Sequence, residues 1–364
     1  MTNNKEFEDI LVLKDIVEEP LQKKKDFLDV LKMFAPGTSL RSALDDLVRA
    51  RMGALIIVDN RGLSEIYEKG FRINSKFTSQ RLVELAKMDG AIILSKNTKR
   101  ILYANTLIFP NQEILTKETG TRHKAAERTA KQVYTIAIAV SERKNKVSIY
   151  YGEQKHELSS SSEILRRATE NLQILEKQRD NFDEIIGKLD ILEFKRMVTV
   201  RDVCFVLQRV EIIKRISEVI KRYLVELGKE GIVVSMRLRE LIANVDKEEE
   251  FVLKDYFGSE KNKIESILKK KDFEFLLDPV NLFGELFEEL PDTKIHSRGI
   301  RILNKSNLLE RDIDSLVGKF KTFENILSAK NDDLIKVFED EGLVEFFKNE
   351  LYNLKEKILS GKFI

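Results

Sequence analysis

The sequence contains one cysteine, Cys204, and three histidines among its 364 residues. A single thiol excludes an intrachain disulfide and is typical of a reducing cytosol. Because zinc sites of the structural kind use four Cys or His ligands, so small a supply argues against one. The longest apolar stretches, such as TIAIAV, are far too short to cross a bilayer. The first residues, MTNNKEFEDI, have no apolar core, so we predict no signal peptide, no membrane contact and a cytoplasmic location.

An excess of one charge sign is also missing. Lys and Arg number 63 against 61 for Asp and Glu, which gives a formal net charge of +2. Any contact with nucleic acid must therefore come from a local basic patch. With 42% apolar and 34% charged residues, the composition is globular, and the length allows two or three domains.

The chain changes character twice. From about residue 31 to residue 151, helical and strand patterns alternate, which indicates an α/β layer fold. The segment SQRLVELAKM is one expected helix there, with Ser79 as its N-cap. The expected strands are GALIIVD, GAIILS, RILYANTLI, YTIAIAVS and KVSIYYG, and the other expected helices are SLRSALDDLVRARM and TRHKAAERTAKQV.

After residue 157 the pattern is helical. The segment EILRRATENLQILEKQRDNFDEIIGKLDILEF fits one helix or two laid end to end, and Gly228 and Gly231 mark a later turn. Beyond Pro291 the helical segments become short. We therefore predict an α/β domain at residues 1–156, a helical spine at 157–290 and a small helical domain at 291–364.

Three stretches have residues suited to chemistry. In KMDGAIILS, Asp89 and Gly90 precede a buried strand that begins at Ala91. Asp-Gly is first of all a turn signal. The functional alternative is a carboxylate at the mouth of the strand, beside a glycine that lets a ligand approach the backbone.

In ETGTRHKAAE, Thr121 opens a helix whose first turn carries Arg122, His123 and Lys124. Cations in the first turn are unfavourable beside the helix dipole unless an anion binds. Unpaired N–H groups and basic side chains together form a phosphate cradle, which we prefer to a solvated basic turn. The third stretch, AVSERKN, ends a strand at Ser141 and offers a weaker phosphate contact.

These stretches resemble the DNA-integrity-scanning diadenylate cyclase family, the bacterial enzymes that make cyclic di-AMP. The motifs KMDGAIILS and GTRHKAAE carry the resemblance, with Thr121 32 positions after Asp89. Flanking stretches agree with it as well: APGTSLRSALDDLVRARMGALIIV, KGF, YANTLIFP and IAVSERKN. The family implies an α/β cyclase domain with a mixed central sheet flanked by helices, a helical spine and a C-terminal helix-hairpin-helix-like domain.

The resemblance also implies roles for residues. Asp89 would serve the attacking ribose 3′-hydroxyl as metal ligand or base, with Mg²⁺ or Mn²⁺ as the metal. Arg122 and His123 would act with Asp89 in catalysis. Nucleotide binding would involve Gly90, Ala91, Ile108, Thr121, Arg122, His123, Lys124, Ala125 and Ser141, with Ile108 against the adenine.

Two positions depart from the family. Lys124 stands where an arginine is usual, which keeps the charge but loses the planar two-pronged fork. Glu142 follows Ser141 where relatives often have a basic residue, and an acid there would repel a triphosphate unless it points away or binds metal.

The reaction constrains the assembly. Two ATP molecules must each present a 3′-hydroxyl to the other's α-phosphate, so two cyclase domains must face each other. We expect a homo-oligomer, and the resemblance implies an octamer.

The C-terminal domain is the expected DNA-binding part. The resemblance implies a hairpin with the pattern Gly-x-Gly, whose backbone amides reach a DNA phosphate. In the matching stretch, KVFEDEGLVEFF, Asp340 takes the place of the first glycine and only Gly342 remains. The surrounding residues are acidic, which opposes contact with phosphates. An upstream basic group remains: Lys294, Arg298, Arg301, Lys305 and Arg311. We expect weak binding of branched DNA, or a domain that is only structural.

The sequence therefore predicts a diadenylate cyclase that condenses two ATP into cyclic di-AMP and two pyrophosphates. Two alternatives are a scaffold that only binds ATP and a non-catalytic protein that binds DNA junctions.

Overall fold

The computed structural model describes residues 21–288 and 290–361. They pack as two compact units: the described residues up to 170 with 220–235, and residues 171–219 with those from 236 to 361. The prediction about a signal peptide concerns the first residues, which lie outside the described part. No helix in the described part is long and apolar enough to cross a membrane. The cytoplasmic location stays a prediction, as do the three predicted domain boundaries.

The first unit is built on a mixed sheet with the strand order β2-β5-β4-β1-β6-β7-β8, and β3 also pairs with β5. Only β1 and β4 run parallel to each other; the other pairs are antiparallel. The strands are β1 Ala54–Val58, β2 Tyr67–Glu68, β3 Phe71–Lys76, β4 Ala91–Leu94, β5 Arg100–Ile108, β6 Ile136–Ser141, β7 Lys146–Tyr151 and β8 Gln154–Leu158.

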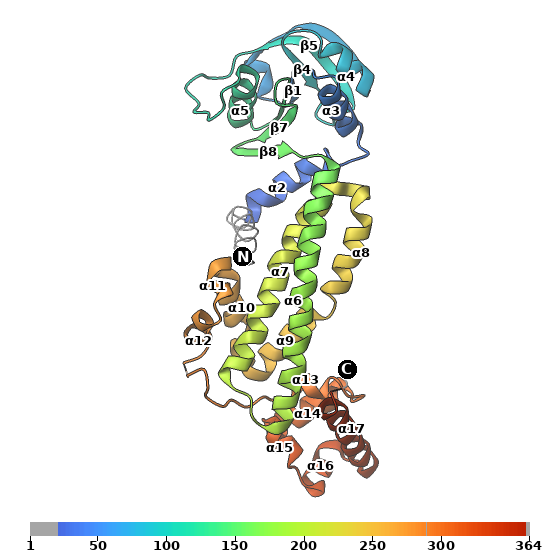
Figure 1. The fold of residues 1–364 in the computed structure, drawn as a ribbon, viewed down its shortest axis with the longest axis vertical. Helices are drawn as coiled ribbons and strands as arrows, with labels where there is room; N and C mark the ends of the chain where they lie inside the picture. The colour runs from blue at the N-terminus through green and yellow to red at the C-terminus, as the bar shows by residue number, and fades with distance from the viewer. Residues whose placement is uncertain (1–20, 289, 362–364) are drawn as a thin grey trace, which may run out of the picture. The chain divides into compact units, whose positions relative to one another are not determined.

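Both faces of the sheet are covered, because every residue of β1 and of β4 is buried. One face packs against α2 (Leu21–Lys32), α3 (Ser39–Arg49) and α4 (Ser79–Leu85). The other packs against α5 (Thr121–Val133) and the short helix η1 (Leu63–Glu65). Figure 1 shows α3 and α5 on opposite sides of the strands. The predicted α/β fold with a mixed, helix-flanked sheet is confirmed.

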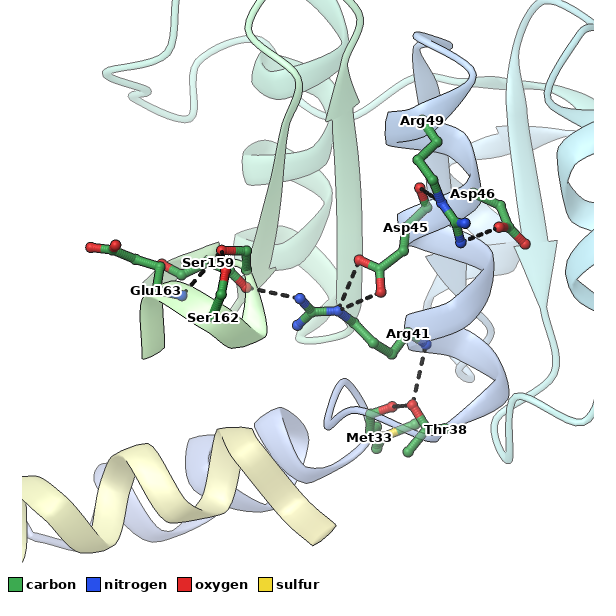
Figure 2. Close-up of polar contacts among 10 residues, drawn as sticks. Met33, Thr38, Arg41, Asp45, Asp46, Arg49, Ser159, Ser162 and Glu163 are labelled. Carbon is green, nitrogen blue, oxygen red and sulfur yellow. Dashed lines mark hydrogen bonds and ion pairs between the residues drawn. The ribbon is translucent and has the colours of Figure 1, made fainter. Parts of the chain in front are cut away.

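Side-chain contacts fix the start of α3. Thr38 caps the helix: its Oγ1 accepts the Arg41 N–H at 3.2 Å and donates to the Met33 carbonyl at 2.9 Å. The Arg41 side chain then binds Asp45 at 3.0 Å and donates to the Ser159 carbonyl at 2.8 Å (Figure 2). Because Ser159 lies just before α6 (Ser161–Lys195), the buried Arg41 joins α3 to the end of the sheet segment.

One predicted cap is wrong. Thr78, not Ser79, caps α4, because its hydroxyl accepts the Arg81 N–H at 3.3 Å. Ser79 is the first helical residue, and its hydroxyl bonds the Asp46 carboxylate on α3 instead. Two adjacent hydroxyl residues offered the same local signal, and packing against α3 decided between them.

The remaining helices confirm the predicted long helical region and the short C-terminal helices. The segment that fitted one helix or two is one helix, α6, and the predicted turn is the 3-10 helix η2 at Gly228–Gly231. The other elements are α7 Val200–Leu227, α8 Ile232–Leu241, α9 Val245–Tyr256, η3 Gly258–Glu260, α10 Lys261–Lys270, α11 Phe273–Leu277, α12 Val280–Leu286, α13 Ile300–Leu303, α14 Glu310–Phe320, α15 Phe323–Leu327, α16 Asn331–Phe338 and α17 Glu341–Leu359.

The C-terminal helices, α13 to α17, share an apolar core with Phe194 of α6, whose ring meets that of Phe323 at 5.3 Å between centroids. Two hairpins join helices here. The α14–α15 hairpin turns at Lys321, which has φ 65°, and the α16–α17 hairpin turns at Glu339, which has φ 57°. The left-handed position of the second hairpin is therefore one residue before Asp340, which has φ −146° and caps α17.

Candidate active site

The strand register brings the predicted residues of the first unit to one edge of the sheet. In the parallel pair of β1 and β4, Leu55 lies opposite Ala91, so both strands begin at this edge. The antiparallel neighbours end there, since Ala54 pairs with Val140 of β6 and Ala91 pairs with Thr106 of β5. The edge therefore carries four segments at the ends of adjacent strands: residues 106–108 of β5, 89–90 before β4, 53 before β1 and 140–141 of β6. Neighbouring strands lie about 4.8 Å apart.

Asp89 lies at the start of β4 and is exposed. Among the described residues, its carboxylate has no hydrogen-bond or ion-pair partner. Such a carboxylate at the mouth of a buried strand is open to a ligand or a metal ion. Asp89 and Gly90 lie in a bend that leads into β4, and within the described residues no hydrogen bond to the Asp89 side chain closes that bend.

Gly90 has a structural requirement of its own. Its φ is +84°, and a Cβ there would lie 2.9 Å from the Thr106 carbonyl oxygen and 3.0 Å from the Thr106 nitrogen of β5. Since β5 cannot move away without breaking the sheet, glycine is needed for the fold. The sequence interpretation was that glycine at position 90 lets a nucleotide approach the backbone. The closeness of the β5 backbone is a separate and sufficient reason for glycine there. Ala91 is buried within β4.

The N-terminus of α5 has the features predicted for a phosphate cradle. Its N-cap, Gly120, makes no side-chain capping bond, and the first turn contains no acidic residue. The leading N–H groups of this 13-residue helix therefore have no side-chain acceptor in the part of the chain that the structure describes. Thr121 and Arg122 are exposed, whereas Lys124 and Ala125 are half-buried.

Arg122 connects α5 to the sheet edge. A Cβ built on Gly53, the residue before β1, would lie 2.5 Å from the Arg122 Nη1 and 3.5 Å from the Val140 carbonyl oxygen. The guanidinium therefore lies directly against the backbone at the point where β1 begins and β6 ends. Sequence reasoning singled out Arg122 but missed Gly53, because nothing in the local pattern links two residues 69 positions apart.

His123 is half-buried, and its ring folds back to within 3.3 Å of where a Gly120 Cβ would be. Burial lowers the pKa of His123; the Glu118 carboxylate opposes this shift, and Lys155 and Lys144 reinforce it. The Lys155 Nζ is itself paired with Glu118, 2.7 Å from its Oε1. Near neutral pH the imidazole is therefore uncharged, and it can donate one hydrogen bond but adds no positive charge.

The last predicted site residues lie on β5 and β6. Ser141 ends β6, and its Oγ accepts the backbone N–H of Lys144 at 3.2 Å, so the hydroxyl is used to close the β6–β7 turn. Glu142 is exposed in that turn. Ile108 is half-buried at the end of β5 and, like Ala125, packs against the core on the α5 side of the sheet. That shared face suits an apolar contact with a planar ring.

No cluster of three or more His, Cys, Asp or Glu side chains that could hold a metal ion occurs within the described ranges. Asp89 is the candidate ligand that the sequence resemblance implied. A lone carboxylate fits Mg²⁺ or Mn²⁺ that arrives with a nucleotide, because Mg²⁺ is usually bound by one or two carboxylates together with substrate phosphates and water. The donor set does not fit a metal ion held by protein side chains alone.

Comparison with known proteins agrees with the sequence resemblance. The family model described as "DisA bacterial checkpoint controller nucleotide-binding" matches residues 41–155, and the model described as "DisA bacterial checkpoint controller linker region" matches residues 158–279. A DNA integrity scanning protein DisA from Clostridioides difficile is 39% identical over 353 residues, which is 93% of this chain and 98% of the relative.

Two further DisA proteins show the same extent of similarity. The one from Clostridium kluyveri is 40% identical and covers 93% of this chain and 98% of its own length. The one from Acetivibrio thermocellus is 42% identical and covers 86% and 90%. A solved structure of DacA from Staphylococcus aureus has 26% identity over 37% of this chain and 90% of its own, with a TM-score of 0.29.

Proposed function

The chain belongs to the DisA family of bacterial checkpoint controllers, and from this premise we propose that the sheet edge with Asp89 and the N-terminus of α5 form its catalytic site. The protein is a diadenylate cyclase, a nucleotidyltransferase that uses ATP. The observation that carries the site proposal is the position of Arg122, whose guanidinium lies against Gly53 at the same sheet edge that presents Asp89.

The reaction joins two ATP molecules. The 3′-oxygen of each ribose forms a bond to the α-phosphorus of the other ATP, the bond from that phosphorus to the bridging oxygen of the β-phosphate breaks, and pyrophosphate leaves. Each 3′-hydroxyl must lose its proton. Asp89 is the carboxylate placed to hold or accept that proton, since it is exposed and has no partner among the described residues.

The triphosphate would lie at the start of α5. The uncapped N–H groups of the helix and the Arg122 guanidinium supply fixed donors for phosphate oxygens, and His123 supplies a neutral one. Positioned donors of this kind stabilise the charge that develops on the leaving pyrophosphate. Ser141 would contribute less, because its hydroxyl already accepts the Lys144 N–H.

The family depends on a divalent metal ion, and we propose that Mg²⁺ or Mn²⁺ fills this role at Asp89. When bound, the ion would neutralise phosphate charge and lower the pKa of the 3′-hydroxyl. The exposed carboxylate of Asp89 is the protein ligand that we assign to it.

A single chain offers one such site, so the reaction needs a second copy that faces it. We propose a homo-oligomer with facing cyclase domains, and the octamer expected from the family remains part of that proposal. A monomeric form should bind ATP without turning it over.

DNA binding by the C-terminal region is proposed only as a weak activity. Two members of the predicted basic group are not available to DNA: Arg301 is fully buried and Lys305 is nearly so, and both are paired with Asp190. In the α16–α17 hairpin, the Asp340 Oδ1 accepts the Gly342 N–H at 2.7 Å, at the place where a phosphate would bind a helix N-terminus. Exposed Lys294, Arg298 and Arg311 remain.

The test of the catalytic site is Asp89→Asn. This variant nearly preserves shape but removes the charge that would hold metal or take the proton. We expect ATP binding to survive and the formation of cyclic di-AMP from ATP and Mn²⁺ to fall at least roughly a hundredfold. Asp180→Asn on α6, also exposed and without a partner in the described part, is the matched control and should leave the rate unchanged.

Each outcome has a separate meaning. Synthesis close to the wild-type rate in Asp89→Asn would reject the role of Asp89. No cyclic di-AMP from the wild-type protein, with ATP still bound, would favour the scaffold that only binds ATP. Binding of a DNA junction without either property would favour the non-catalytic junction-binding protein.

A further inference from the structure

Gly53 is a glycine that its backbone does not require. It lies between Met52 and the start of β1, and its φ is outside the left-handed region in which glycine is preferred. Gly90 is different. Its φ is +84°, which favours glycine, and backbone atoms of β5 surround the position that a Cβ would take. A side chain at position 53 would be acceptable for the chain conformation, so the reason for glycine must be space.

The space beside Gly53 is occupied by one side chain. A Cβ at this position would lie 2.5 Å from the Arg122 Nη1 and 3.1 Å from its Cζ, whereas the nearest backbone atom, the Val140 carbonyl oxygen, is 3.5 Å away. Carbon atoms do not approach a nitrogen to 2.5 Å, so the guanidinium would have to move. Because it is the far end of a flexible side chain, it can move without disturbing β1 or β6.

The guanidinium that would move is available for a ligand. In residues 21–288 and 290–361, the Arg122 side chain makes no hydrogen bond and no ion pair. Its location is therefore set by its contact with the backbone at Gly53 and not by a charged partner. A planar guanidinium needs a defined orientation to make two parallel hydrogen bonds to a phosphate, which a flexible side chain reaches only at an entropic cost.

We propose that Gly53 is a positioning residue: the absence of its side chain creates the place in which the Arg122 guanidinium lies, oriented toward the polyphosphate of ATP. This inference rests on the proposed function and adds a determinant of ATP affinity that does not itself contact the nucleotide. It predicts that a single methyl group at position 53 acts as a partial loss of Arg122.

The first test is Gly53→Ala, studied in the full-length protein with a non-hydrolysable ATP analogue and with ATP turnover. A displaced guanidinium loses a charge-assisted hydrogen bond and should weaken analogue binding by at least about tenfold, which corresponds to about 1.4 kcal/mol. We expect KM for ATP to rise by about the same factor and kcat to fall less. Gly53→Val should weaken binding further, because it needs more space.

The matched control is Gly62→Ala, beyond the other end of β1. The φ of Gly62 is −85°, and an added Cβ would meet the Val133 side chain at 3.4 Å, an ordinary contact. Analogue binding should equal that of the wild type. This control separates the effect of any glycine replacement near β1 from the effect of displacing Arg122.

The decisive measurement is a double-mutant cycle with Arg122→Ala. Once the guanidinium is gone, a methyl group at position 53 has nothing to displace, so Gly53→Ala should cost less than about twofold in that background. If Gly53→Ala alone lowers the melting temperature, the same cycle applies to stability, and Arg122→Ala should restore it. This keeps the test valid even if the single variant folds poorly.

Three results would overturn the inference. These are wild-type affinity in Gly53→Ala, an equal loss in the wild-type and Arg122→Ala backgrounds, or an equal loss in Gly62→Ala. None of them resembles a failure of the proposed function, which would appear as absent binding of the ATP analogue by the wild-type protein.

Discussion

Arg301 and Glu193 form an ion pair in which both side chains are 0% exposed, with 2.8 Å between Nη2 and Oε2. The other terminal nitrogen, Nη1, lies 2.5 Å from the Asp190 Oδ1, and the Lys305 Nζ lies 2.6 Å from the Asp190 Oδ2. These contacts join α13 to α6 within the second unit. Two residues that sequence patterning assigned to a DNA-facing surface are therefore part of a buried ionic cluster.

Arg301→Met should be strongly destabilising. It removes the cation and leaves the carboxylates of Glu193 and Asp190 buried near each other, with Lys305 as the remaining charged partner. Breaking a buried pair from one side typically costs about 3–5 kcal/mol of unfolding free energy. Arg311→Met is the control: this arginine is 77% exposed, and its loss should cost less than about 1 kcal/mol. Chemical denaturation gives both values, and equal costs would contradict the role of the cluster.

Asp255 should make stability depend on pH. Burial, reinforced by Glu193, raises the pKa of this carboxyl from 3.8 to about 7, although the Ile300 and Arg301 N–H groups at the start of α13 donate to it. The folded protein therefore keeps this proton between about pH 4 and pH 7, where the unfolded chain has lost it. The contribution of Asp255 to the unfolding free energy thus falls as pH rises through this window and is constant above it.

The variant that tests this is Asp255→Asn, which does not titrate. Its fixed cost from altered hydrogen bonding is independent of pH, so the wild type should lose stability relative to the variant between about pH 4 and pH 7 and no further above pH 7. The measurement is chemical denaturation of both proteins at each pH. A difference in unfolding free energy that stays constant, or that moves in favour of the wild type as pH rises, would reject the assignment.

Lys124→Arg should strengthen the proposed ATP site. Lys124 stands in the first turn of α5, and its backbone N–H donates to the Gly120 carbonyl at 2.9 Å. An arginine would keep the charge and add a two-pronged contact with phosphate. We expect tighter binding of an ATP analogue or faster synthesis of cyclic di-AMP. A decrease in both quantities would mean that the site is adapted to lysine. The control is Lys117→Arg, in the loop before α5.

Branched DNA should bind weakly and only at low salt. Affinity for duplex DNA comes mainly from Lys and Arg side chains that neutralise phosphates, and the loss of Arg301 and Lys305 from the surface leaves few of them. Titration of a four-way junction at low and near-physiological salt, with synthesis followed in parallel, should show inhibition only at low salt. Tight binding that is insensitive to salt would contradict this prediction.

Asp340→Asn tests the second hairpin separately. Asparagine can still cap α17, so the variant removes a charge and keeps the fold. If the Asp340 carboxylate of the wild-type protein blocks a phosphate position beside Gly342, the variant should bind the junction more tightly than the wild type at low salt. Asp180→Asn again provides the matched control. Unchanged affinity would mean that this hairpin does not meet DNA.

The amino-acid sequence by itself determined the elements with strong local patterns. The predicted strand RILYANTLI is β5 and the predicted helix TRHKAAERTAKQV is α5, residue for residue. Both carry their signal in contiguous residues. The motifs around Asp89 and Thr121 likewise carried the resemblance to the family, because each of them is a contiguous stretch.

Elements without an apolar pattern were not predicted from the sequence. The strands β2, β3 and β8 alternate between exposed and half-buried positions, so they lack the buried runs that mark central strands. Their pairing partners decide that they are strands: β2 and β3 both pair with β5, and β8 pairs with β7. That information lies in backbone hydrogen bonds to distant segments.

Only the tertiary structure decided what individual side chains are for. Gly53 and Arg122 are 69 residues apart, and Arg301 and Glu193 are 108 apart, yet each pair is in contact. The sequence showed that Arg301 is a cation in a basic segment, which fits a DNA surface as well as a buried pair. The burial of Arg301 decides between these roles. It depends on the fold, which brings the carboxylates of Asp190 and Glu193 to this side chain.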